Sequence, residues 1–212
     1  MSAYLLDHPP RRRQYRVGRR ARPTGAQVLH SFEIAPDLHG TDMGAEKGAS
    51  IIRNRTDAAG SYHLLGDRDS EILLVPLEWE AFHDGTGSNP WSIGLSLAVT
   101  AAWFRAAPDT EKLWYMARLA SMGRRASNWL KANHGIETPA RRLTRTSQHE
   151  AGFCTHMDRE TWKGRRGRRT DPWGDSDDMW HLFLTLYEDT ANHPQKGLMP
   201  EIAIIDAFVT LP

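Results

Sequence analysis

Short apolar runs separated by polar turns predict a β-sheet. Residues 26–31 (AQVLHS), 61–67 (SYHLLGD) and 71–77 (EILLVPL) have the length and composition of strands, and a tight turn joins the last two. Residues 91–99 (WSIGLSLAV) are almost continuously apolar, which is typical of a strand buried on both faces. Residues 152–156 (GFCTH) form another short strand that ends in a histidine. These runs together predict one central sheet.

Longer segments with a 3.6-residue apolar period predict helices. The clearest begins with a cap at Asp109 or Thr110 and ends near Gly135, a glycine stop. A sparser helical pattern covers residues 41–55, and a last helix starts near Ser176 with Trp180, Phe183, Leu184 and Tyr187 on one side. The apolar residues 201–212 are interpreted as a strand or extended segment. The chain is therefore expected to be α/β, with a central mixed β-sheet flanked by helices.

The size and composition fit one globular domain. A chain of 212 residues buries about 70% of its unfolded surface on folding. The mean hydropathy is −0.57, and no apolar run approaches the roughly 18 residues of a membrane span, so stable membrane insertion is not expected. The first residues lack the order of a secretory signal, because their charges follow a very short apolar patch. The single cysteine, Cys154, excludes an internal disulfide and fits synthesis in a reducing cytoplasm.

The positive charge is concentrated in two segments, although the net charge is only +1. Residues 11–22 (RRRQYRVGRRAR) hold a run of arginines, and residues 163–169 (KGRRGRR) form a second cluster. We expect residues 1–23 to be a basic, loosely packed arm and residues 24–212 to be a single domain. The arm is either simply solvated or attracted to a polyanion. Nucleic acid is not an expected partner, because no recognised nucleic-acid-binding motif accompanies the charge.

Two histidines and an aspartate have contexts that suit a metal site. His30 and His156 each end a short apolar strand, and Asp171 precedes a proline in a turn (RRTDPWGD) ahead of a helix. Catalytic zinc sites use three protein ligands of these types and keep a fourth position open for water. The chain has ten histidines, so spacing alone leaves alternatives open, among them His149.

The order of six short motifs resembles a known family. VLHS, SYHLLGDRD, FHDG, NPWSIGLSLA, GFCTHMD and GRRTDPWGD follow one another as in the type 2 N-acetylmuramoyl-L-alanine amidases, a family that includes the peptidoglycan recognition proteins and many phage endolysins. The resemblance runs from about residue 26 to residue 183. The insertion at residues 36–55 is most similar to amidase domains of lysins from phages of actinobacteria.

The resemblance implies a zinc site and two catalytic groups. His30, His156 and Asp171 match the family's zinc ligands. Tyr62 matches a tyrosine that lies over the zinc and orients or deprotonates the attacking water. Arg169 stands where relatives often carry lysine, and a cation there stabilises the oxyanion of the tetrahedral intermediate. Cys154 does not match a ligand position and is interpreted as a core residue.

The sequence departs from some relatives at the general base. They place a catalytic glutamate where this chain has Ser96, and a serine cannot serve as that base. The role then falls to Tyr62, which we favour, or to Glu33, three residues after His30.

Further residues match the substrate groove of the family. His83 corresponds to an element that borders the groove, with structural support and a plain surface position as alternatives. Asn89 and Trp91 precede the 91–99 strand, where relatives line the groove, and core packing is the alternative for Trp91. His63 points away from Tyr62 because side chains alternate along a strand, so a hydrogen-bonded core position is expected.

The implied function is zinc-dependent hydrolysis of the amide bond between N-acetylmuramic acid and L-alanine in bacterial peptidoglycan, by a single catalytic domain over residues 24–212. The protein is expected to be a monomer, made in the host cytoplasm without a signal peptide and acting on the cell wall after release. Two alternatives remain: a peptidoglycan-binding module of the same fold without catalysis, and a zinc peptidase that cuts within the stem peptide.

Overall fold

A mixed five-stranded sheet forms the centre of the molecule. The structure is a computed structural model that describes residues 2–34, 36, 44–167 and 171–192. The strands of the sheet are β2 (Ala26–Ser31), β3 (Leu64–Gly66), β4 (Glu71–Leu73), β6 (Ile93–Leu97) and β7 (Gly152–Thr155). Their order is β4-β3-β6-β2-β7, with β4 antiparallel to β3 and all other neighbours parallel. A separate two-stranded ribbon pairs β1 (Tyr15–Arg16) with β5 (Glu80–Ala81).

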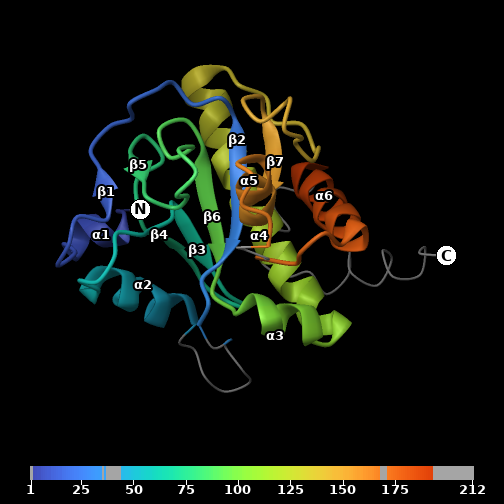
Figure 1. Ribbon diagram of the computed structural model, residues 1–212, viewed down its shortest axis with the longest axis horizontal. Coiled ribbons are helices and arrows are strands. Elements are labelled where there is room, and N and C mark those ends of the chain that lie inside the picture. The colour runs from blue at the N-terminus through green and yellow to red at the C-terminus, as the bar shows by residue number, and fades with distance from the viewer. Residues whose placement is uncertain (1, 35, 37–43, 168–170, 193–212) are drawn as a thin grey trace.

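Helices cover both faces of this sheet (Figure 1). They are α1 (Tyr4–Asp7), α2 (Gly44–Asn54), α3 (Ala101–Ala106), α4 (Asp109–His134), α5 (His156–Trp162) and α6 (Asp177–Asn192). The long helix α4 and helix α6 pack together over one face, where Leu29, Leu95 and Phe153 point into the largest apolar core. Helices α2 and α5 lie on the opposite face, which also carries His30 and Ser96. The expected α/β architecture is confirmed.

The elements expected from the sequence are present, with differences at their ends. Helix α4 ends as expected at Gly135, whose φ of 67° is the left-handed conformation that glycine adopts easily. At its other end the N-cap is Pro108, which provides no side-chain cap, rather than Asp109 or Thr110. The 152–156 strand stops at Thr155, because the side chains of Thr155 and Asp158 form a capping box that starts α5 at His156.

Helix α2 begins at Gly44, and residues 41–43 of the helix expected over 41–55 lie outside the described residues. The apolar segment at 201–212 lies outside them as well. Helices α3 and α5 were not anticipated from the sequence, since each is too short to show a full apolar period.

The N-terminal segment is packed against the sheet rather than loose. Leu5 is fully buried in a core with Leu65 and Leu74, and its backbone N–H donates to the carbonyl of Leu74. β1 adds a second attachment by pairing with β5. The expectation of a loosely packed arm therefore does not hold for residues 2–23. The division of the chain at residue 23 stays a prediction.

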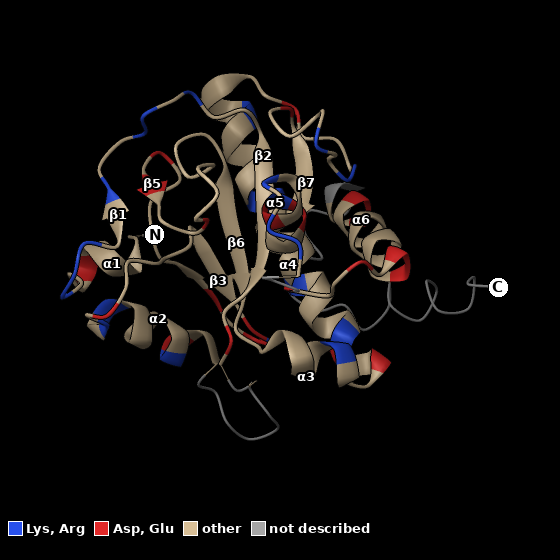
Figure 2. Ribbon diagram, in the orientation of Figure 1, with Lys and Arg blue, Asp and Glu red and all other residues tan. Residues whose placement is uncertain are grey.

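Most arginines of this segment are engaged by the domain, along the blue stretches between α1 and β2 in Figure 2. The Arg19 guanidinium is half-buried and donates to the carbonyls of Leu77 at 2.6 Å and Ser92 at 2.9 Å. Arg12 and Arg22 also donate to backbone carbonyls, and Arg16 and Arg20 lie within 4 Å of the Glu80 carboxylate. These arginines thus attach the segment to the fold. None of the helices in the described ranges is both long and apolar enough for a membrane crossing.

Candidate metal centre

A buried group of two histidines and an aspartate lies at one edge of the sheet. His30, His156 and Asp171 offer ligand atoms that all lie within 4.8 Å of one another, and each residue is at most 8% exposed. The Asp171 Oδ2 atom lies 3.7 Å from His30 Nδ1 and 3.4 Å from His156 Nδ1. The structure thus brings together the three residues that the sequence placed in one site, and this group is able to hold a metal ion.

The fold explains why these residues meet. β2 and β7 are parallel neighbours with Leu29 opposite Thr155, so His30 and His156 follow side by side at the carboxyl edge. Asp171 approaches from the turn that precedes α6. Residues at the carboxyl ends of neighbouring parallel strands are a common source of binding sites in α/β proteins.

The donor set and its spacing fit zinc. Tetrahedral zinc with bonds of about 2.0–2.2 Å to nitrogen and oxygen separates its ligand atoms by about 3.4 Å, close to the observed 3.4 and 3.7 Å. Burial lowers the pKa of His30, which favours the neutral imidazole that a metal needs. Burial alone would raise the pKa of Asp171, but hydrogen bonding to His156 and His30 outweighs it and leaves the pKa below its ordinary value. Three ligands also leave a position for water or substrate, as in catalytic zinc sites.

The other ring nitrogen of each histidine faces a nearby side chain. His30 Nε2 lies 3.1 Å from His83 Nδ1, and His156 Nε2 lies 3.6 Å from Glu160 Oε1, one helical turn along α5. Glu160 in turn pairs with Arg165, at 2.6 Å between Oε2 and Nε. A hydrogen-bonded outer partner holds a ligand ring in orientation, and His83 is such a partner for His30, whereas His156 Nε2 has no hydrogen-bond partner among the described residues. Glu160 was not predicted from the sequence, although its i+4 spacing from His156 is a usable signal once α5 is recognised as a helix.

The two candidates for the general base occupy different environments. The half-buried Tyr62 ring lies 5.1 Å from the His30 ring, on the ligand-bearing face of the sheet. The exposed Glu33 uses its Oε1 atom to accept from Ser31 Oγ at 2.7 Å and from the backbone N–H of Ala101 at 3.0 Å. Glu33 therefore binds the first turn of α3 and does not belong to the metal group. The role of Tyr62 as the general base stays a prediction.

Of the residues matched to the substrate groove, His83 contacts His30 of the metal group, and Asn89 and Trp91 contact residues next to it. His83 is 6% exposed and has both ring nitrogens in contact with protein atoms, which favours structural support over a surface position. The Asn89 side chain accepts from the backbone N–H groups of His83 and Asp84, so it shapes this loop. Trp91 is half-buried with its ring 4.9 Å from the Arg159 guanidinium. Substrate contact by Asn89 or Trp91 stays a prediction.

Arg159 is a supporting residue that the sequence did not reveal. Its buried guanidinium lies 3.3 Å from Asp84 Oδ2 and donates to Gln148 Oε1 at 2.7 Å. It connects α5, which begins with His156, to the loop that carries His83. Its partner Asp84 lies 75 positions away, and no local pattern marks the pair.

Other candidates lie outside this group. Cys154 is buried inside β7, and burial raises the pKa of its thiol well above the usual range, as expected for a core residue. His149 packs its ring against Trp91. His63 is buried, with Nδ1 accepting from the Gly94 N–H and Nε2 donating to the Trp79 carbonyl, as a satisfied core histidine does. Arg169 lies outside the described residues.

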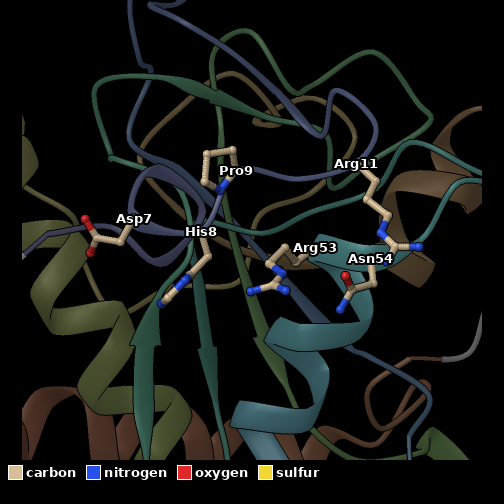
Figure 3. Close-up of a pocket in the computed structure, with 6 residues that line it drawn as sticks. All are labelled: Asp7, His8, Pro9, Arg11, Arg53 and Asn54. Carbon is tan, nitrogen blue, oxygen red and sulfur yellow. The ribbon is translucent and has the colours of Figure 1, made fainter.

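A separate open hollow of 330 Å³ lies between the N-terminal segment and the end of α2 (Figure 3). Its lining consists of Asp7, His8, Pro9, Arg11, Arg53 and Asn54. None of the residues of the metal group contributes to it, so this hollow is distinct from the candidate centre.

Comparisons with known proteins bear on the fold. No protein-family model matches the sequence, and no curated protein matches it. Among solved structures, the hydrolase AmiA from Staphylococcus aureus, solved in complex with its ligand, superposes with a TM-score of 0.53 at 17% identity over 81% of this chain and 76% of that chain. The catalytic domain of XlyA superposes with a TM-score of 0.50 at 20% identity over 85% of this chain and 96% of that one. The chain therefore has the type 2 amidase-like fold that the sequence motifs predicted.

Proposed function

We propose that the protein is a zinc-dependent amidase that hydrolyses the bond between N-acetylmuramic acid and L-alanine in bacterial peptidoglycan. The observation that carries this proposal is the buried His30, His156 and Asp171 group, with the spacing of a three-ligand zinc site. It occurs in a fold shared with the hydrolase AmiA, at the sheet edge where the parallel strands end. The intact ligand set argues against a binding module that has lost its metal.

The proposed reaction assigns separate tasks to the residues around the centre. His30, His156 and Asp171 hold the zinc ion, which when bound polarises the scissile carbonyl and acidifies water. The Tyr62 side chain, in its phenolate form, would accept the proton of the attacking water and then, as the neutral phenol, donate it to the leaving amine. Arg169 is proposed to stabilise the developing oxyanion. Ser96, directly opposite His30 in the sheet register, carries no proton-transfer role.

Metal content and product chemistry test the proposal together. The purified protein should bind one zinc ion per chain, and incubation with peptidoglycan should release new alanine amino groups without new reducing sugar ends. His156→Ala should lose most of the zinc and all of the cleavage, because it removes a ligand. His181→Ala, which changes an exposed histidine on α6, is the matched control and should retain both.

The alternatives give different products. Muropeptides with shortened stems would identify a peptidase. Tight binding to peptidoglycan without any cleavage by the zinc-loaded protein would identify a binding module. Full zinc content in His156→Ala would show that the ligand set is wrong.

A further inference from the structure

A chain of hydrogen bonds leads from the metal group to a buried carboxylate. His30 Nε2 lies 3.1 Å from His83 Nδ1, and His83 Nε2 lies 3.1 Å from Ser92 Oγ. Ser92 Oγ donates to the Ser88 carbonyl at 2.9 Å, and the Ser88 hydroxyl donates to Asp84 Oδ2. All five residues are buried. A neutral imidazole has one N–H, so the direction of each hydrogen bond decides which nitrogen of His30 is unprotonated.

The direction can be worked out from the carboxylate end. Asp84 pairs with the Arg159 guanidinium and accepts from Ser88, so the Ser88 hydroxyl hydrogen is committed to it. The Ser92 hydroxyl has the carbonyl oxygen and the hydroxyl oxygen of Ser88 within 3.0 Å, and both accept. Ser92 Oγ therefore turns a lone pair toward His83. It follows that His83 Nε2 carries the hydrogen and that His83 Nδ1 is unprotonated.

The metal end requires the same arrangement. An unprotonated Nδ1 on His83 accepts a hydrogen bond from His30 only if His30 carries its hydrogen on Nε2. His30 Nδ1 is then unprotonated, and it is the atom that lies 3.7 Å from Asp171 Oδ2. A histidine binds a metal through an unprotonated nitrogen, so the two ends of the chain agree on one tautomer.

We propose that His83 is a positioning residue, which fixes His30 in the tautomer whose Nδ1 faces the metal, with Asp84 setting the direction of the hydrogens. The inference rests on the metal site of the proposed function but not on the reaction. A histidine N–H directed at a defined acceptor is a common way for proteins to orient a ligand ring.

Two neighbouring residues make room for His83 and hold it. A Cβ atom at Gly94 would overlap the His83 ring, so the glycine in β6 allows the ring to lie directly on the sheet. The Asn89 side chain accepts from the backbone N–H of His83 at 3.2 Å. His83 is thus fixed at its backbone, at its ring face and at both ring nitrogens.

Zinc affinity and histidine tautomers test the proposal directly. Chelator competition should show zinc binding weakened by roughly 10- to 100-fold in His83→Phe, the usual effect of losing an outer partner. His83→Asn should recover part of this loss, because its Oδ1 can replace the Nδ1 acceptor. His181→Phe, an exposed site, is the control and should bind zinc like the wild type. Nitrogen NMR of the zinc-loaded wild type should find hydrogen on Nε2 of both His30 and His83.

The outcomes separate this inference from the proposed reaction. A hydrogen on His83 Nδ1 in the zinc-loaded wild type would overturn the inference, and this measurement needs no variant to fold. Wild-type zinc affinity in folded His83→Phe would overturn it too. If the wild type failed to bind zinc, the metal site and this inference would fall together. Zinc binding with the expected tautomers but no cleavage of peptidoglycan would refute the reaction and leave the role of His83 supported.

Discussion

Removing the Arg159 charge should destabilise the protein by several kcal/mol. The Arg159 and Asp84 side chains are 2% and 0% exposed, and their closest charged atoms lie 3.3 Å apart. Arg159→Met keeps an apolar stem of similar length but leaves Asp84 as a buried, uncompensated carboxylate. Breaking a buried pair in this way costs about 3–5 kcal/mol. We expect the lower end, about 3 kcal/mol, because Asp84 keeps the hydrogen bonds from Thr86 and Ser88.

The stability lost in Arg159→Met should depend on pH, and the pKa of Asp84 gives the direction of this dependence. Burial raises the pKa of Asp84, but hydrogen bonds from Ser88 and Thr86 and the Arg159 charge outweigh it, so the pKa lies below its ordinary value. A carboxyl group with a depressed pKa stabilises the fold above its unfolded pKa of about 3.9, and this stabilisation is lost as pH falls through the folded pKa. Without Arg159 the pKa of Asp84 rises. The penalty of Arg159→Met should then be full at neutral pH and shrink as Asp84 becomes protonated in acid.

Urea unfolding with a chelator present measures this effect without a contribution from bound metal. For a chain of this size about 3 kcal/mol corresponds to a fall in Tm of roughly 6–12 °C. Arg145→Met, at an exposed arginine, is the control and should stay within about 0.5 kcal/mol of the wild type. Asp84→Asn combined with Arg159→Met should recover much of the loss, because no charge is then left buried. The reasoning is refuted if the double variant is no more stable than Arg159→Met, or if the penalty does not change with pH.

Three further perturbations have defined outcomes. Tyr62→Phe should lower turnover by about 10²- to 10⁴-fold with zinc retained. Glu33→Gln should mainly reduce stability, by about 1 kcal/mol, because Glu33 binds the start of α3. Kinetics and unfolding of both variants check this, and the reverse ranking would make Glu33 the base. Leu5→Ala should cost about 2–4 kcal/mol in unfolding experiments, because Leu5 is fully buried; an unchanged stability would mean that the N-terminal segment is loose after all. Cys154 should react with a thiol reagent only after unfolding, and Cys154→Ala should keep zinc, so rapid labelling of the native protein would contradict its place in the core.

Elements that depend on local sequence patterns were predictable before the structure was known. Apolar runs marked the sheet strands, because a strand covered on both faces needs apolar side chains along its length. The apolar period and the glycine stop at Gly135 marked α4. Motif order selected the amidase fold and put His30, His156 and Asp171 into one hypothesis, which the carboxyl edge of parallel strands makes geometrically natural.

Contacts between residues distant in sequence that belong to no motif became visible only in the folded structure. The run of N-terminal arginines predicted a loosely packed arm. In the structure most of these arginines contact carbonyls or carboxylates of the domain, such as the Leu77 carbonyl bound by Arg19. His83 and Arg159 have partners 53 and 75 positions away, so no periodicity or spacing identifies their roles. Composition sets which groups can donate or accept, but only packing fixes which of them meet. For that reason the nitrogen that His30 turns to the metal is a property of the fold.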